Sequence, residues 1–393
     1  MIITEILFWI SFGLLFYCYI GYGLIMLLVN NIRVLFLKEK KIESKDLPAV
    51  TVIVTACNEE AILERKINNT IGIEYPADKL HILFVTDGSG DGSAELVRKF
   101  PRVGLLHQAT RKGKYAAIKS AMRQVTTPFV VFSDANSMLN PECLKKMMVH
   151  YKDKKTGGVA GEKKILRNRY ESVVGEAEGI YWQYESFMKK MDAELYTVAG
   201  AAGELFSIRS ELFREMNDEI ILDDFIISMQ VCLQGYKIEY EPDAYATESP
   251  SASLLEEEKR KIRISAGAYQ SIGYLKECLN IFRHPLLSFQ YISRRLLRWV
   301  FCPVALFLLL LTNIFIVTRQ HTDIYGSILL AQSFFYGFAI LGWLFVSSGR
   351  RAGLFTIPFY FVFMNYCLVK GFTRFVKGKQ TVLWEKSLRQ AME

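Results

Sequence analysis

Four long runs without charged residues stand out in the pattern of apolar and polar positions, and a longer mixed region separates the first run from the other three. A helix needs about 20 apolar residues to cross the hydrocarbon core of a bilayer. Three of the runs are therefore predicted to be transmembrane helices. The fourth contains Pro358 and Asn365 and is either a further span or a re-entrant or interfacial segment. The runs cover residues 6–29, 299–318, 324–348 and 352–369.

Basic residues beside these runs predict the orientation of the chain. A basic segment, residues 33–45, follows the first run, and Arg294, Arg295 and Arg298 precede the second. Because basic flanks stay on the cytoplasmic side, the middle region is expected in the cytoplasm of a multi-pass cell-membrane protein, with the amino terminus outside. Simple alternation would put the carboxyl terminus outside, whereas the basic tail favours the inside. A fourth run that does not cross the bilayer removes this conflict.

In the middle region, short apolar segments alternate with helical patterns. Strands are predicted at residues 49–56, 81–86, 103–107 and 129–133, the first of them buried, and helices follow the first, second and third of them. Asn58 is the expected cap of the first helix. Strands separated by helices indicate a mostly parallel, Rossmann-like sheet with right-handed crossovers, and hence an α/β fold joined to transmembrane helices.

These patterns divide the chain into five parts. An N-terminal transmembrane helix (1–37) precedes a cytoplasmic α/β domain (38–253), followed by amphipathic or interfacial helices (254–298), C-terminal transmembrane helices (299–376) and a basic tail (377–393). Within the third part, a helix over residues 265–292 is expected to lie on the membrane or to pack on the α/β domain, using Ile272, Leu275, Leu279 and Phe282.

The composition supports this division. Hydrophobic residues make up 51% of the chain and charged residues 22%, as expected of apolar blocks beside a soluble region. Seven scattered cysteines without a CxxC pair indicate a reducing compartment and no structural zinc. Much of the net charge of +8 flanks the apolar runs, so it suits anionic lipid headgroups and implies no nucleic-acid partner.

Acidic residues follow the predicted strands. Asp87 follows the second strand in a glycine-rich turn, Asp134 follows the fourth, and Asp223 and Asp224 begin a later helix. Ligands of open α/β sheets bind at the carboxyl ends of the strands, and hard cations prefer oxygen ligands. The set predicts a Mg²⁺ or Mn²⁺ site that holds phosphates, although each motif alone also fits a turn or a helix cap.

Six ordered motifs carry a resemblance to a known family: VTACNEE (54–60), TDGSGD (86–91), KGK (112–114), SDAN (133–136), GAAG (200–203) and LDD (222–224). They resemble the family 2 glycosyltransferases over residues 48–300, in particular the membrane-bound branch with the cellulose, chitin, hyaluronan and poly-N-acetylglucosamine synthases. The resemblance implies a GT-A-like catalytic domain that transfers a sugar with inversion from a nucleotide sugar, such as a UDP-sugar.

The resemblance also implies a role for each matching residue. Asp224 would be the general base, with Asp223 orienting it, and Gly203 would lie where the acceptor meets the donor sugar. Asp134 and Asn136 would hold Mg²⁺ or Mn²⁺. The residues expected to bind the nucleotide sugar are Thr55, Glu59, Asp87, Lys114, Asp134, Arg260 and Arg263.

The chain departs from the family pattern at two positions. Family members often have a second aspartate where this chain has Asn136, which lowers the charge available for a metal. The motif that contains Arg260 and Arg263 lacks its usual tryptophan, which Ile264 replaces, so processive synthesis is left open. Elsewhere, Tyr181, Trp182 and Tyr184 either stack on sugar rings or pack in the core.

Three functions remain open from the sequence. The first is synthesis of a cell-surface or exported polysaccharide from a nucleotide sugar, with a glycan or lipid-linked acceptor, membrane lipids and membrane subunits as partners. The second is transfer of one sugar to a polyprenyl phosphate. The third is a non-catalytic membrane scaffold or transport subunit, which would have no need of Asp224.

Overall fold

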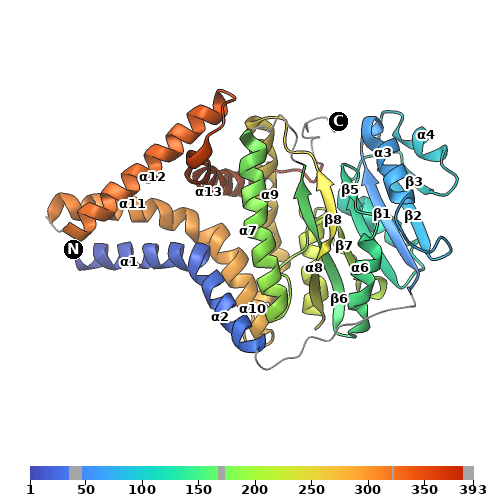
Figure 1. Ribbon diagram of the computed structural model, residues 1–393, viewed down its shortest axis with the longest axis horizontal. Coiled ribbons are helices and arrows are strands. Elements are labelled where there is room, and N and C mark those ends of the chain that lie inside the picture. Colours follow the sequence, from blue (N-terminus) through green and yellow to red (C-terminus); the bar gives the residue numbers. More distant parts are fainter. Residues whose placement is uncertain (35–46, 167–172, 321–322, 384–393) are drawn as a thin grey trace.

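One mixed sheet of eight strands forms the centre of the α/β domain (Figure 1). The computed structural model describes residues 1–34, 47–166, 173–320 and 323–383. The strands lie in the order β3-β2-β1-β4-β7-β6-β8-β5. They are β1 (Val50–Ala56), β2 (Leu80–Asp87), β3 (Gly104–Gln108), β4 (Phe129–Asp134), β5 (Ser137–Leu139), β6 (Thr156–Ile165), β7 (Phe206–Arg209) and β8 (Lys237–Glu248).

The four predicted strands are confirmed as β1 to β4, and they pair in parallel. All seven residues of β1 are buried, as expected of an apolar run inside a parallel sheet covered on both faces. The second half of the sheet is mixed: β7 runs antiparallel to both β4 and β6, while β6 and β8 are parallel. The predicted mostly parallel α/β fold is therefore confirmed.

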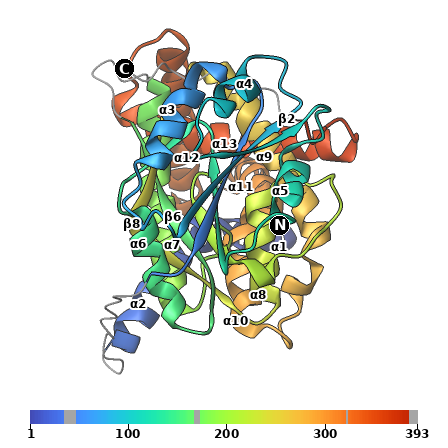
Figure 2. The same ribbon diagram turned by 90° about the vertical axis from the view of Figure 1, so that its right-hand side faces the viewer.

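Helices cover both faces of the sheet and bury alternate strand residues. Val52 and Val54 point into one core with α3 and α6, whereas Ile53 points into the other with α5 and α8. Figure 2 shows α3 and α6 on one side of the sheet and α5 and α8 on the other. These helices and the short α4 are α3 (Glu60–Ile71), α4 (Ser93–Arg98), α5 (Lys114–Met122), α6 (Cys143–Val149) and α8 (Asp223–Leu233).

The prediction that Asn58 caps the first of these helices is wrong. The helix α3 begins at Glu60, and Asn58 lies before it with a left-handed φ of 56°. Its side-chain oxygen accepts a hydrogen bond from the backbone N–H of Gly90, at 2.8 Å. Asn58 therefore joins the turns after β1 and β2, because an asparagine tolerates this backbone conformation better than most residues.

Apolar helices extend from one side of the α/β domain (Figure 1). The first begins as α1 (Ile2–Phe16), passes through a π-helical turn (Tyr17–Gly21) and continues in a different direction as α2 (Tyr22–Val34). Such π-helical turns are a common cause of bends in helices. Four described segments are long and apolar enough to cross a membrane: Ile2–Ile32, Pro285–Arg319, Asp323–Ser347 and Gly353–Val376.

The predicted helix over residues 265–292 is wrong, because two helices share this segment. The first, α9 (Leu254–Tyr274), ends before Leu275, which is fully buried in the core of the α/β domain. Pro285 then begins α10 (Pro285–Tyr291), as expected of a residue that lacks a backbone N–H. A π-helical segment, η5 (Ile292–Phe301), connects α10 to α11 (Cys302–Arg319).

The last apolar helix packs on the α/β side of the molecule. The helix α13 (Thr356–Val376) follows α12 (Asp323–Ser347) and contacts both α9 and the long α7 (Val173–Leu195). Close packing with α9 depends on Gly371, because a methyl group there would lie 2.3 Å from Cβ of Ser265. Figure 1 shows α1, α11 and α12 reaching away from the sheet, whereas α13 lies beside α7 and α9.

Candidate functional site

A cavity of about 1050 Å³ opens at the carboxyl ends of the parallel strands. Thr55 and Asp134 are neighbouring residues at the ends of β1 and β4, and both line the cavity. Glu59 also lines it, just after β1, and its backbone N–H donates to the hydroxyl of Ser93 at 3.2 Å. The cavity is thus at the sheet edge where the sequence predicted a ligand site.

Lys114 brings two of the predicted acidic residues together. Its Nζ lies 2.7 Å from Oδ1 of Asp134 and 3.4 Å from Oδ2 of Asp223. Lys114 is the first residue of α5 and Asp223 the first of α8, so both side chains project from helix N-termini into the cavity. Burial alone would lower the pKa of Lys114, but the carboxylates of Asp134, Asp223 and Asp224 raise it overall, so the lysine is a permanent cation here.

Gly203 lies at the centre of this group. A methyl group at this position would lie 2.8 Å from Nζ of Lys114, 3.2 Å from Oδ2 of Asp224 and 3.4 Å from Oδ2 of Asp134. Any side chain would therefore fill the space between the charged groups. The close approach predicted for Gly203 is consistent with this geometry, because the missing side chain leaves a small space between the charged groups.

Asp224 has an unusual electrostatic environment. Burial raises the pKa of its carboxyl group to about 7, the negative charge of Asp223 acts in the same direction, and Lys114 opposes them. A carboxyl group with a pKa near 7 exchanges a proton readily at neutral pH. The arrangement can therefore accept a proton from a hydroxyl group that enters the space beside Gly203.

Asp87 has a different place from the other acids. Its side chain is fully buried, and its two carboxylate oxygens accept hydrogen bonds from the backbone N–H groups of Lys112 and Gly113, both at 2.8 Å. Asp87 is absent from the cavity lining among the described residues. The contacts of Asp87 fix the turn that precedes Lys114. Asp134 and Asp224 therefore converge on the cavity, whereas Asp87 helps to position Lys114, which lines it.

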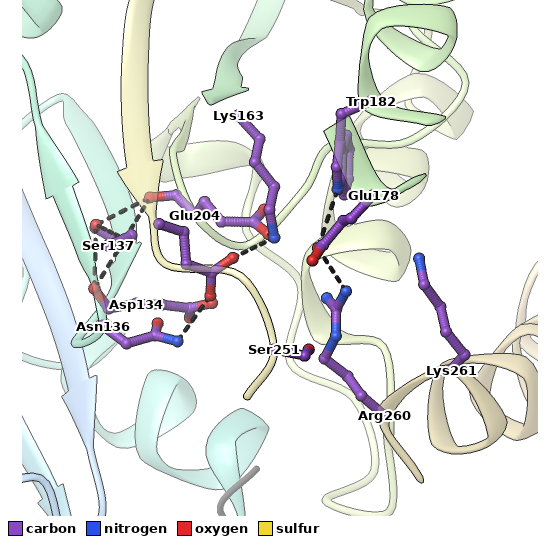
Figure 3. Close-up of polar contacts among 12 residues, drawn as sticks. Asp134, Asn136, Ser137, Lys163, Glu178, Trp182, Glu204, Ser251, Arg260 and Lys261 are labelled. Atoms are coloured by element: carbon purple, nitrogen blue, oxygen red, sulfur yellow. Dashed lines mark hydrogen bonds and ion pairs between the residues drawn. The ribbon is translucent and has the colours of Figure 1, made fainter. Parts of the chain in front are cut away.

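Asn136 is held by a buried network that the sequence did not predict (Figure 3). Its amide nitrogen donates to Oε1 of Glu248 at 2.7 Å, and Glu248 forms an ion pair with Lys163. Lys163 also lies 2.5 Å from Oε1 of Glu204. Because the amide nitrogen of Asn136 is engaged, its oxygen is the atom left for a ligand of the cavity.

The residues fit a divalent cation only in combination with a ligand. Among the described residues no group of three His, Cys, Asp or Glu side chains is placed to hold a metal ion. Asp134 and Asn136 line the cavity and supply oxygen atoms, which Mg²⁺ and Mn²⁺ accept. Mg²⁺ in particular is usually bound by one or two side chains together with substrate phosphates, so this sparse set suits such an ion.

The two arginines of α9 differ in their surroundings. Arg260 lies 2.7 Å from Oε1 of Glu178 (Figure 3). It also lies 2.9 Å from Oε2 of Glu257, and both glutamates are fully buried, so the charge of Arg260 is already compensated. Arg263 lines the cavity, and its Nε has no hydrogen-bond partner within the described part of the chain. Burial lowers the pKa of Arg263, while Asp223 and Asp224 oppose this effect. Arg263 is therefore better placed than Arg260 for an anionic ligand.

Aromatic side chains line the cavity beyond the charged group. Trp182, Tyr181 and Tyr184 are among them, and Nζ of Lys163 lies 4.9 Å from the ring centre of Trp182. Ile264 also lines the cavity. Trp299 of η5 supplies an aromatic side chain to the lining and packs edge-on against Phe225, with 5.4 Å between the ring centres. Trp299 lies at the start of an apolar run, where its position in the sequence gave no sign of a site.

The basic tail also reaches the cavity. Of the residues after α13 that the structure describes, Lys379, Gln380, Thr381 and Leu383 line it. A methyl group at Gly113 would lie 3.5 Å from Cγ2 of Val382, so the tail passes beside the turn that leads to Lys114. The sequence predicted the charge of this tail but assigned it no contact.

Comparisons with known proteins relate the chain to glycosyltransferases. Residues 51–216 match the family model Glycosyl transferase family 2, so this segment is a glycosyltransferase family 2 domain. The chain is 25% identical over 253 residues to poly-beta-1,6-N-acetyl-D-glucosamine synthase of Staphylococcus aureus (strain COL), a match over 61% of this chain and 60% of that protein. For the synthase of Staphylococcus epidermidis the identity is 23% over 233 residues, covering 55% and 56% of the two chains.

A solved structure confirms the fold. Mannosyltransferase PcManGT from Pyrobaculum calidifontis, solved in complex with GDP-Man and Mn²⁺, superposes with a TM-score of 0.72 at 19% identity. The match covers 95% of this chain and 99% of that one. The two proteins therefore share the GT-A-like sheet and the long apolar helices. The staphylococcal synthases, in contrast, are matched over only about three fifths of their length.

Proposed function

We propose that this chain transfers a sugar from a nucleotide-sugar donor to a hydroxyl group of a glycan acceptor, with inversion, in the synthesis of an exported polysaccharide. The observation that carries the proposal is the grouping of Lys114, Asp134, Asp223 and Asp224 around Gly203 in a family 2 glycosyltransferase domain. The similarity to poly-beta-1,6-N-acetyl-D-glucosamine synthases supports a polysaccharide as the product.

The catalytic role proposed for Asp224 follows from its pKa. As the acceptor hydroxyl attacks the anomeric carbon of the donor, Asp224 accepts its proton, and a base with a pKa near 7 suits this step at neutral pH. Asp223 is paired with Lys114 and raises the pKa of Asp224 by its charge. Direct displacement of the leaving nucleotide then inverts the anomeric centre.

The cationic groups of the site bind the donor and compensate the charge of the leaving diphosphate. Lys114 and Arg263 serve this purpose, since charged donors form strong hydrogen bonds with phosphate oxygens. Thr55 and Glu59 contact the nucleotide, and Asp87 acts by fixing the turn before Lys114. Asp134 and Asn136 would hold Mg²⁺ or Mn²⁺, and such an ion would supply positive charge that stabilises the leaving diphosphate.

The proposed setting is a cell membrane, with the catalytic domain and the carboxyl terminus both in the cytoplasm. The first apolar helix, α11 and α12 cross the bilayer, and α13 lies along its inner face against α9. The contact between Gly371 and Ser265 supports this arrangement, because it ties α13 to a helix of the cytoplasmic side. Three crossings also explain why basic residues flank both α2 and α13.

Incubation of the purified chain in detergent with a panel of radiolabelled UDP- and GDP-sugars, with and without Mn²⁺, tests the proposal. One donor should give a labelled glycan whose size separates single transfer from polymerisation, and chelation of the metal should stop its synthesis. Failure of every donor to label a glycan or a lipid-linked product, in a preparation that binds nucleotide, would refute the proposed activity.

A further inference from the structure

Glu204 is a carboxylate of the cavity that the proposed mechanism does not use. It directly follows Gly203, and its side chain lines the cavity with 12% of its surface exposed. Gly203 lies between the proposed metal ligand Asp134 and the proposed base Asp224, since a methyl group there would lie 3.4 Å and 3.2 Å from their carboxylates. Glu204 is therefore next to the space in which the donor sugar would be attacked.

The backbone of Glu204 is fixed to the turn that carries Asp134. Its carbonyl oxygen accepts hydrogen bonds from the side-chain hydroxyl groups of Ser133 and Ser137, at 3.0 Å and 3.2 Å. These two serines directly flank residues 134–136, and Figure 3 shows Ser137 next to this turn. A carboxylate held on such a rigid support keeps its position relative to the proposed metal ligands.

The side chain of Glu204 is held by Lys163 and keeps the capacity to accept further hydrogen bonds. Nζ of Lys163 donates to Oε1 of Glu204 at 2.5 Å, and no other ion-pair partner of Glu204 lies within the described part of the chain. Burial would raise the pKa of Glu204, but the charge of Lys163 lowers it overall, so the group stays ionised at neutral pH. An ionised carboxylate has about four acceptor positions, of which the lysine takes one.

The positive charge around Glu204 is shared with other carboxylates. Lys163 also forms an ion pair with Glu248. Lys189, a second cation near Glu204, acts on Glu162 as well. Two lysines thus face three carboxylates, so this wall of the cavity keeps a negative charge, which attracts hydroxyl donors and repels an anionic group of a ligand.

We propose that Glu204 selects the transferred sugar: its carboxylate accepts hydrogen bonds from hydroxyl groups of the donor sugar, so that a neutral sugar is bound and a uronic acid is rejected. The inference rests on the proposed function and adds the chemical class of the donor. A site built to bond a hydroxyl group discriminates strongly, because its polar group is left without a partner when that hydroxyl group is missing. The carboxylate of a uronic acid would also bring a second negative charge toward Glu204.

Binding of donor pairs that differ only in the oxidation of the sugar's primary hydroxyl group tests this proposal. The pairs are UDP-glucose, UDP-N-acetylglucosamine and GDP-mannose, each with its uronic acid, and UDP and GDP serve as references. The full chain is used in detergent with Mn²⁺. For the donor that binds, the neutral member of the pair should bind at least about tenfold more tightly than the uronic acid, since a charge-assisted hydrogen bond contributes about that factor.

Two substitutions of buried carboxylates provide a matched pair. Glu204→Gln keeps the shape of the side chain and removes its charge, so it should lower the ratio of the two affinities about tenfold without changing the affinity for the bare nucleotide. Glu162 is also buried, bonds Tyr240 and Ser186, and is absent from the cavity lining among the described residues. Glu162→Gln should therefore leave the ratio unchanged. Glu204→Asp withdraws the carboxylate by one methylene group and should weaken the neutral donor while the uronic acid is still rejected.

Each result decides between defined outcomes. Equal binding of both members of a pair by wild type, or a ratio that Glu204→Gln leaves unchanged, overturns the inference even if sugar transfer is intact. A fall in the ratio that Glu162→Gln shares, or a parallel loss of bare nucleotide binding, reports disturbed packing and overturns it as well. Selective binding by wild type without transfer of any sugar instead refutes the proposed function. Should Glu204→Gln fail to fold, the wild-type ratio and Glu204→Asp decide.

Discussion

At the scale of single residues, the chemistry depends on how burial and neighbouring charges act on Asp224. Its pKa of about 7 exceeds the ordinary value of 3.8, because burial and Asp223 both disfavour the ionised form. A proton acceptor has to be ionised, so activity is limited below this pKa. The same shift means that the folded state binds the proton more tightly than the unfolded state does.

The pH dependence follows with a definite sign. The kcat/KM for transfer should rise about tenfold per pH unit below pH 7 and level off above it. Between pH 4 and 7 the raised pKa makes stability fall as pH rises, so Asp224→Asn should increase the Tm more at pH 8 than at pH 5. Transfer rates over pH 5–9 check the first prediction, and melting curves of wild type and Asp224→Asn over the same range check the second. A flat rate profile over this range would contradict the role of Asp224.

Asn136 is a departure from the family pattern for which the structure provides a reason. The amide nitrogen of Asn136 donates a hydrogen bond of 2.7 Å to buried Glu248. Asn136→Asp would replace this donor by a second carboxylate. We expect a loss of about 1–3 kcal/mol in stability without metal, because Oε1 of Glu248 would lose its donor and the new carboxylate would repel it, while Lys163 stays paired with Oε2. Thermal unfolding in EDTA measures it. Addition of Glu248→Gln should restore the donor and most of the stability, whereas equal stability of Asn136→Asp and wild type would contradict the contact.

Residue types could be predicted from the sequence more readily than their partners. Asp134 and Asp224 follow strand and helix boundaries that hydrophobic patterns reveal, and they meet at the cavity as expected. Asp87 and Arg260 match the sequence motifs equally well, but other groups of the protein bind them. The carboxylate of Asp87 accepts hydrogen bonds from backbone N–H groups, and the guanidinium of Arg260 pairs with buried glutamates. Such pairings depend on contacts between distant segments, which a local pattern does not contain.

At the scale of elements, the contact between α9 and α13 joins the catalytic domain to the last apolar helix. Gly371→Ala would place a methyl group 2.3 Å from Cβ of Ser265 and 2.8 Å from the backbone nitrogen of Ala266. Overpacking of this kind typically costs about 1–3 kcal/mol. The matched control is Gly337→Ala on α12, which meets no atom within 4 Å. Thermal unfolding should show a lower Tm for the first variant only, and equal Tm values would contradict the packing.

Helix boundaries show where local patterns fall short. The strands β1 to β4 contain short apolar stretches and were predicted to within one residue at each end. The segment 265–292 has helical periodicity throughout, yet it contains the end of α9, a break and the start of α10. Leu275 is drawn into the core of the catalytic domain, so tertiary burial decides where α9 ends.

At the scale of the whole molecule, the proposed topology places both the catalytic domain and the tail in the cytoplasm. All seven native cysteines are buried, so engineered cysteines report accessibility without interference. Lys145→Cys and Lys377→Cys should react with a membrane-impermeant maleimide only after cell disruption, whereas Gln320→Cys, at the end of α11, should react in intact cells. Labelling of Lys377→Cys in intact cells would show that α13 crosses the bilayer.

The central claim is that distant acidic residues form one transferase site with Asp224 as its base, and Asp224→Asn tests it most directly. Transfer of radiolabelled sugar and binding of nucleotide are measured on the same purified protein, with Asp218→Asn, an exposed substitution, as the control. Transfer should fall about 10²–10⁴-fold while nucleotide affinity and the control stay unchanged. Transfer within a few-fold of wild type, or parallel loss of nucleotide binding, would contradict the account.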